Sequence, residues 1–131
     1  MNNVKLNPDC IRDILFVVEE NTSFNQMLRL TDDNMFGLES KYQHDEILYH
    51  VRQCQWSNLL DVEMWTMTGD CLIKDLTPLG HEFIANVRKN EVWTNVKNIA
   101  GQIGSASLSA LVQIASNVVT NLIKSQFSII S

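Results

Sequence analysis

The sequence has few of the residues that cross-link or interrupt a chain, and it has no long hydrophobic run. Its 131 residues include 3 cysteines, none of them in a CxxC pair, 5 glycines and 2 prolines. An odd number of distant cysteines predicts neither a disulfide framework nor a zinc knuckle. No stretch reaches the roughly 18 uncharged apolar residues of a membrane span, and no signal-peptide pattern follows the first methionine. We therefore expect a cytoplasmic protein with reduced thiols.

Basic residues are also scarce, and they are unevenly distributed. The chain has 15 Asp or Glu against 10 Lys or Arg, which gives a formal net charge of −5. Residues 1–82 carry 14 acidic and 6 basic residues, a balance of −8, whereas residues 83–131 carry 1 and 4, a balance of +3. This distribution argues against the broad basic surface from which most nucleic-acid binders gain their affinity.

The remaining composition is that of a globular protein. The length, with 45% hydrophobic residues, suits a single globular domain with a substantial core. We expect a domain over residues 1–99, a linker over residues 100–105 and a C-terminal amphipathic helix over residues 106–127. Two glycines within the six residues AGQIGS indicate the linker.

The stretch from Tyr42 to Asp61 predicts a helix of about four turns that ends in a tight turn. Ser57 and Asn58 are expected to end this helix, and a strand should follow directly. Four apolar side chains recur at helical spacing and predict its buried stripe: Ile47, Leu48, Val51 and Cys54.

A first helix is predicted to begin at Pro8, because Asn7 is a good N-cap and proline is tolerated at the first helical position. The next segment, residues 24–41, is less regular. Residues 27–30 fit a short strand, and a shortened second helix is expected either at residues 34–38 or in the turn before Tyr42. The predicted core stripe of the first helix is Ile11, Ile14, Leu15 and Val18.

A β-hairpin is predicted after the central helix. Residues 62–67 and 71–76 favour strands, and Gly69 between them can take the positive φ of a hairpin turn. Thr77 and Pro78 then repeat the signal for a helix start, and a third long helix with a kink at Asn90 is expected. These elements predict a mostly helical α+β fold, with a winged helix-turn-helix core, a β-hairpin wing and the extra C-terminal helix.

The C-terminal helix has the most regular apolar stripe of the chain, opposite a nearly uncharged polar face. Such a helix cannot stay solvated alone. We expect its stripe either to pack on its own domain or to pair with a second copy in a homodimer.

Four short segments have a more specific pattern: KLNPDCIR from residue 5, DEI with YH from residue 45, LTPLGHEF from residue 76, and NVR with VW from residue 86. Through them the chain resembles the uncharacterised domain-of-unknown-function family twenty-five-thirteen over residues 5–97. The resemblance implies a winged-helix-like fold and a setting in Gram-positive bacteria and their phages, but no reaction and no active site. One departure is Asn58, which stands where the family has glycine and can take the same left-handed cap conformation.

Two pairs of residues could in principle carry out chemistry. His50 and Cys54 lie one helical turn apart, a spacing that can chelate a metal. Because Cys54 falls on the apolar stripe, a core thiol beside a surface histidine is the favoured interpretation. His81 and Glu82 could act as a general acid/base pair, although a structural role at a helix start is favoured. We predict no catalytic residue, no metal and no cofactor, and therefore no enzyme.

The outward face of the central helix offers the best candidate binding residues. Aromatic residues and Arg52 are types that anchor protein interfaces, and Arg52 and Gln53 can also read base edges in DNA. Trp56 and Trp65 could instead close the core under the wing. The predicted binding residues are Tyr49, Arg52, Gln53, Trp56 and Lys74.

Acidic residues weigh against DNA as the partner. Asp45 and Glu46 would approach the phosphates first in the usual docking of such a helix, so repulsion is expected. We therefore expect a non-enzymatic protein of phage or prophage type that binds a protein partner, as an inhibitor or modulator of a host or defence factor. The alternative is a DNA-binding transcriptional regulator that dimerises through its final helix. No membrane partner is expected.

Overall fold

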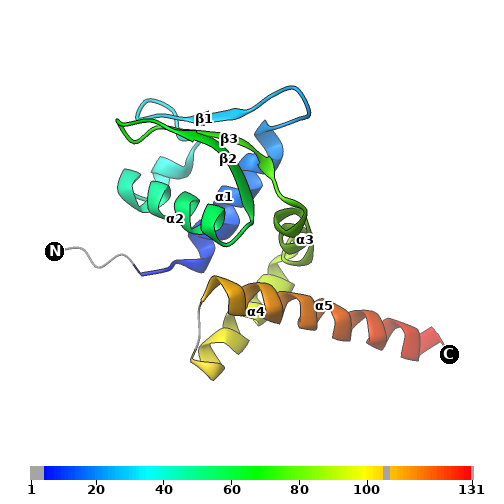
Figure 1. The fold of residues 1–131 in the computed structure, drawn as a ribbon. Coiled ribbons are helices and arrows are strands. Elements are labelled where there is room, and N and C mark those ends of the chain that lie inside the picture. The colour runs from blue at the N-terminus through cyan, green and yellow to red at the C-terminus, as the bar shows by residue number, and fades with distance from the viewer. Residues whose placement is uncertain (1–4, 105–106, 131) are drawn as a thin grey trace. The chain divides into compact units, whose positions relative to one another are not determined.

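A computed structural model describes residues 5–104 and 107–130. Within these residues the protein is α+β, with five α-helices, one short 3₁₀ helix and a three-stranded antiparallel sheet (Figure 1). The chain divides at His81 and Glu82 into two compact units. None of the helices in the described part of the chain combines the length and the hydrophobicity that crossing a membrane requires.

The first unit begins with α1 (Pro8–Asn21), and the predicted N-cap is confirmed. The Asn7 side-chain oxygen accepts hydrogen bonds from the backbone N–H groups of Asp9 and Cys10, at 3.1 and 3.4 Å. These bonds satisfy amides that the first helical turn leaves without a partner. All four residues of the predicted stripe are buried: Ile11, Ile14, Leu15 and Val18.

The irregular segment after α1 contains both elements that the sequence predicted. The strand β1 (Leu28–Leu30) is short, and its two leucines are buried. Of the two positions considered for a shortened helix, the one directly before Tyr42 is occupied, by the 3₁₀ helix η1 (Leu38–Ser40). The alternative at residues 34–38 is wrong, because Phe36 takes a positive φ of 59° that breaks any helix there.

The helix α2 (His44–Trp56) ends where it was predicted to end. Asn58 takes a φ of 61°, the left-handed conformation expected of a residue that replaces glycine at a helix end. Three residues of the predicted stripe are buried: Ile47, Val51 and Cys54. Leu48 is only half-buried, and His50 is fully buried instead, so the prediction of a surface histidine is wrong.

The hairpin consists of β2 (Leu60–Trp65) and β3 (Cys71–Leu76), and the sheet order is β1-β3-β2. Strand β2 begins two residues earlier than predicted, because Leu60 pairs with Leu76 across the ladder. Gly69 supplies the expected positive φ, 96°, in the turn. Both α1 and α2 lie on the same side of the sheet in Figure 1, and the core of this unit fills the space between helices and sheet.

The helix α3 (Pro78–Asn86) starts at the predicted proline, but it does not continue as one long kinked helix. A break at residues 87–89 separates it from α4 (Asn90–Ile103). Residues 100–103, which were predicted as linker, belong to α4, and Gly104 ends that helix with a φ of 72°. Ser105, the end of the predicted linker, and Ala106, the predicted start of the last helix, lie outside the described residues.

In the second unit, α4 packs beside the first half of α5 (Leu108–Ile130), as Figure 1 shows. The edge-to-face contact of Phe83 and Trp93, with ring centroids 6.3 Å apart, joins α3 to α4. The first half of α5 therefore packs against a helix of the same chain. This was one of the two arrangements considered for the helix, and pairing with a second copy was the other. The buried residues of that half are Leu108, Leu111, Ile114, Ala115 and Val118.

Candidate binding surface of α2 and the hairpin

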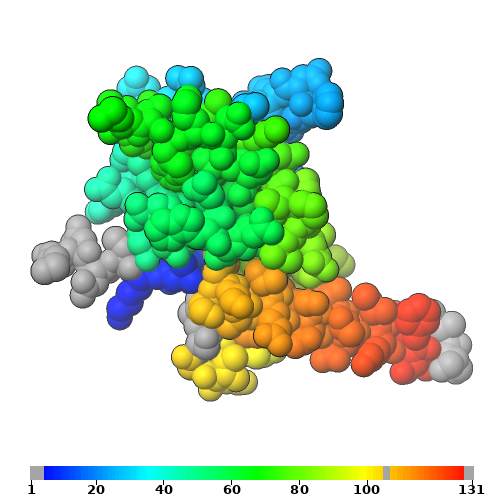
Figure 2. All heavy atoms as spheres, in the orientation of Figure 1, coloured from blue at the N-terminus to red at the C-terminus, as the bar shows by residue number. Residues whose placement is uncertain are grey.

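A groove lies between the outward face of α2 and the β2–β3 hairpin, in the first unit. We call it the α2–hairpin groove. In Figure 2 the teal-to-green atoms of α2 and the green atoms of the hairpin lie next to each other. The groove has a volume of about 720 Å³ and is lined by Asp45, Leu48, Tyr49, Arg52, Gln55, Trp56, Trp65 and Gly69.

Helical spacing and one glycine build this groove. The lining residues of α2 recur every three or four positions and so share one face of the helix. The turn of the hairpin approaches that face at Gly69, whose φ of 96° favours glycine. A Cβ atom at this position would lie 3.6 Å from Cδ1 of Leu48, an ordinary van der Waals distance that shows how close the turn lies to the helix. The wall and the floor of the groove are therefore set by local backbone geometry.

Two side-chain contacts fix the aromatic residues of the groove. The indole N–H of Trp65 donates a hydrogen bond of 2.8 Å to the side-chain oxygen of Gln55, which ties the hairpin to α2. The guanidinium of Arg52 lies 5.0 Å from the ring centroid of Trp56, a cation–π arrangement. Trp56 is 68% exposed, so the alternative in which it closes the core is wrong.

The structure brings together three of the five predicted binding residues: Tyr49, Arg52 and Trp56. Gln53 is half-buried and does not line the groove, and Lys74 lines a different pocket. The prediction did not include Leu48 and Gln55 as binding residues. Leu48 is four residues before Arg52 and Gln55 is three residues after it, a spacing that would have identified both, whereas the contribution of Gly69 depends on how the hairpin folds back.

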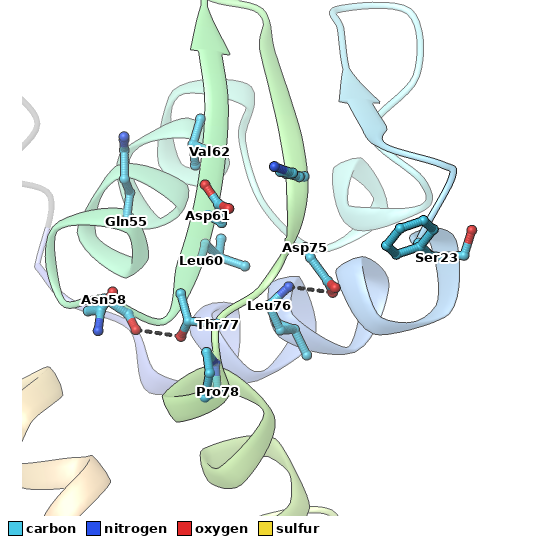
Figure 3. Close-up of a pocket in the computed structure, with 12 residues that line it drawn as sticks. Ser23, Gln55, Asn58, Leu60, Asp61, Val62, Asp75, Leu76, Thr77 and Pro78 are labelled. Carbon is cyan, nitrogen blue, oxygen red and sulfur yellow. Dashed lines mark hydrogen bonds between the residues drawn. The ribbon is translucent and has the colours of Figure 1, made fainter.

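Lys74 belongs to a second pocket of about 520 Å³ at the exit of α2, shown in Figure 3. Asp61 and Asp75 face each other directly across the β2–β3 ladder there. The Asp75 carboxylate accepts hydrogen bonds from the backbone N–H of Leu76 (2.7 Å) and from the Thr22 hydroxyl (3.3 Å). Because Tyr49, Arg52 and Trp56 line the α2–hairpin groove and the described residues that line this second pocket include no tryptophan, tyrosine or arginine, the groove is the stronger candidate for a binding site.

The side chains considered for catalysis have structural contacts. Both ring nitrogens of His50 are engaged at 2.8 Å: Nε2 accepts from the backbone N–H of Asn7, so Nδ1–H donates to the Glu46 carbonyl. His81 Nε2 lies 3.7 Å from Asp75 Oδ1. Within residues 5–104 and 107–130, no group of three or more His, Cys, Asp or Glu is arranged to hold a metal ion.

We predict that the three thiols resist alkylation in the folded protein. Burial raises the pKa of Cys10 and of Cys71 to about 12, and it also raises the pKa of Cys54. Iodoacetamide at about pH 8 should label all three cysteines in urea and none in buffer, as measured by intact mass, because the thiolate is the nucleophile. Labelling of the folded protein at the rate of a free cysteine would contradict this prediction.

The same pKa shifts make the stability pH-dependent. A thiol whose pKa is higher in the folded state stays protonated there after the unfolded chain has lost its proton. The contribution of such a thiol to the free energy of unfolding is thus fully present below the pKa that the thiol has in the unfolded chain. It decreases as the pH rises toward 12. The free energy of unfolding should fall by up to about 1.4 kcal/mol per thiol and pH unit above about pH 9.

A match over residues 5–107 identifies the family of this α+β chain. The chain belongs to the family described as "Hypothetical protein (DUF2513)", whose model matches residues 5–107. This confirms the family resemblance seen in the sequence. An uncharacterized protein of Haemophilus influenzae is 25% identical over 123 residues, which cover 92% of this chain and 99% of that protein. No solved structure matches.

Proposed function

We propose that this chain is a winged-helix protein that acts by binding another protein through the α2–hairpin groove. The order α1, β1, η1, α2, β2, β3 supports the winged-helix assignment, because η1 occupies the place of a shortened second helix. The sheet order β1-β3-β2 supports it as well, since the hairpin then forms the wing beside α2. In this assignment α2 is the helix that carries the binding face.

The exposed Trp56 is the single observation that carries the proposed protein partner. Tryptophan, tyrosine and arginine are the residues that most often dominate the affinity of protein interfaces, and here all three types meet in one groove. Covering about 100 Å² of apolar indole surface would stabilise a complex by about 2.5 kcal/mol. A concave surface of this composition suits a protuberance of a protein partner.

The charges beside the groove favour a basic partner. Asp45 and Glu46 lie in the first turn of α2, and Asp70 follows Gly69 in the hairpin turn. The alternative of a DNA-binding regulator has less support. The Arg52 guanidinium is stacked on Trp56, while Gln53 and Lys74 lie outside the groove, so the three candidate base-reading or phosphate-binding residues do not converge.

We propose a binding protein rather than an enzyme, because Cys54 and His50 are buried and already have structural roles. The phage or prophage setting, with a host or defence factor as the target, is part of the proposal on the basis of the family resemblance alone. We also propose a cytoplasmic location, as expected from the sequence.

The test is a pull-down from a bacterial lysate, with and without nuclease, using the intact chain and two variants. Trp56→Ala removes the exposed anchor of the groove. Phe24→Ala is the matched control, because Phe24 is a fully exposed aromatic residue of the same unit that lies outside the groove. We expect a protein band that survives nuclease, is retained by Phe24→Ala and is reduced at least about tenfold by Trp56→Ala.

Two outcomes would contradict the proposal. A protein band that both variants retain would place the interface elsewhere on the chain. Recovery of nucleic acid that is lost on raising the salt concentration would identify the DNA-binding alternative, because phosphate contacts weaken steeply with salt.

A further inference from the structure

A second apolar surface lies on the last turns of α5. This helix has 23 residues and α4 has 14, so at 1.5 Å per residue α5 is longer by about 14 Å. Its stripe is buried as far as Val118. Beyond that point three large apolar side chains are exposed, which we call the α5 overhang: Leu122 (48%), Ile123 (51%) and Phe127 (67%).

The α5 overhang continues a stripe that is already an interface. Ile123 and Phe127 are four residues apart and share one side of the helix, with Leu122 next to them. The first half of α5 uses its stripe to pack against α4, and the same helix carries apolar residues past the point where that packing ends. Exposed apolar side chains grouped in this way are typical of a surface that a partner covers.

Charge indicates which surface can cover the overhang. Residues 108–130 contain no acidic residue and one basic residue, Lys124. Residues 1–81 carry 13 acidic and 6 basic residues, whereas residues 82–131 carry 2 and 4. The first unit therefore has a negative formal net charge and the second unit a positive one. A contact between the first unit of one copy and the second unit of another brings opposite net charges together, whereas a contact between two copies of the same unit brings like net charges together.

The α2–hairpin groove has the matching properties. It is a largely apolar and aromatic concavity whose two charged lining residues are Asp45 and Arg52, and the Arg52 guanidinium is stacked on Trp56. An amphipathic helix that places apolar residues at successive turns into such a groove is a recurrent mode of recognition. Asp45 also provides a carboxylate for the only basic side chain of α5, Lys124.

We propose that the α5 overhang of one copy docks into the α2–hairpin groove of a second copy. Each contact joins two different surfaces of the chain. Two reciprocal contacts close an isologous dimer, whereas a single heterologous contact leaves one groove and one overhang open for further copies. If the groove is also the site of the proposed protein partner, that partner competes with self-association.

The test is sedimentation velocity of the intact chain from about 1 to about 200 µM, a range that detects micromolar self-association. The overhang variant is Phe127→Asp and the groove variant is Trp56→Ala, both at exposed positions. Each variant alone should weaken self-association at least about tenfold. An equimolar mixture should recover association and stop at the dimer, because one intact groove and one intact overhang remain. Phe24→Asp, the control, should behave like the unaltered chain.

Three results would overturn the proposal. The first is a chain that stays monomeric over the whole range. The second is association that Phe127→Asp abolishes and Trp56→Ala leaves unchanged, which would mean that two overhangs pair with each other. The third is a mixture that stays monomeric. The pull-down reports separately on the protein partner, so a Trp56-dependent band with a monomeric chain would leave the proposed function intact and reject self-docking alone.

Discussion

Replacing Gly80 with alanine is expected to destabilise the first unit by about 3 kcal/mol or more, the range of the most damaging single substitutions. Gly80 lies in the first turn of α3, where alanine would ordinarily be the better helix former. A Cβ atom at this position, however, would lie 2.1 Å from the carbonyl oxygen of Leu59. That carbonyl also accepts a hydrogen bond of 3.1 Å from the backbone N–H of Thr77. The methyl group therefore has to push α3 away from the turn after α2.

The matched control is Gly101→Ala. Gly101 is also a helical glycine, but a Cβ atom there meets nothing within 4 Å. This substitution should stabilise the chain by about 0.5–1 kcal/mol through helix propensity. Urea unfolding followed by circular dichroism measures both variants. A Gly80→Ala variant as stable as Gly101→Ala would mean that Gly80 does not approach the Leu59 carbonyl closely.

Replacing His50 with alanine is expected to reduce the free energy of unfolding by about 3 kcal/mol, from the cavity and from the lost hydrogen bonds together. His50 is fully buried and joins two elements that are distant in the sequence. Its Nε2 accepts the Asn7 amide at the start of α1, and its Nδ1 contacts the Glu46 carbonyl in α2. Without the imidazole, the Asn7 N–H loses its acceptor in a part-buried site, which is costly.

His44→Ala provides the comparison for His50→Ala. His44 is a second histidine of α2, but its contacts to Asp32 and Asp45 are on the surface. Its removal should change the stability by no more than about 0.5 kcal/mol. Urea unfolding gives the two values, and amide hydrogen exchange should show faster exchange at Asn7 in His50→Ala alone. Equal effects of the two substitutions would exclude a structural role for the buried imidazole.

Local signals in the sequence predicted the elements whose ends are determined by a few neighbouring residues. Asn7 followed by Pro8 located the start of α1, and Gly69 located the hairpin turn, because each of these residues acts through its own backbone or side chain. Asn58 adopts the left-handed conformation for the same reason. The resemblance to the family identified the domain, but it implied no reaction and no active site.

Features that depend on distant contacts were harder to predict. His50 is three residues after Ile47 and four before Cys54, so its position was on the buried stripe, but only the fold shows that Asn7 supplies its partner. Apolar residues continue to recur at helical spacing as far as Val87. For this reason α3 and α4 were predicted as one helix. The groove was predicted in part, since the spacing on α2 identifies one wall and the fold of the hairpin supplies the other.

The sheet order also determines when the first unit can fold during synthesis. Strand β3 is central in the sheet yet last in the sequence, and it pairs with β1 so that Ile73 faces Leu28, about 45 residues earlier. Until β3 leaves the ribosome, β1 and β2 have no strand to pair with, because they are not neighbours in the sheet. The hairpin then closes locally, within microseconds, while β1 has to close a long loop. The nascent chain thus completes its sheet late, first the hairpin and then the pairing of β1, and both outer strands remain unpaired until β3 has emerged.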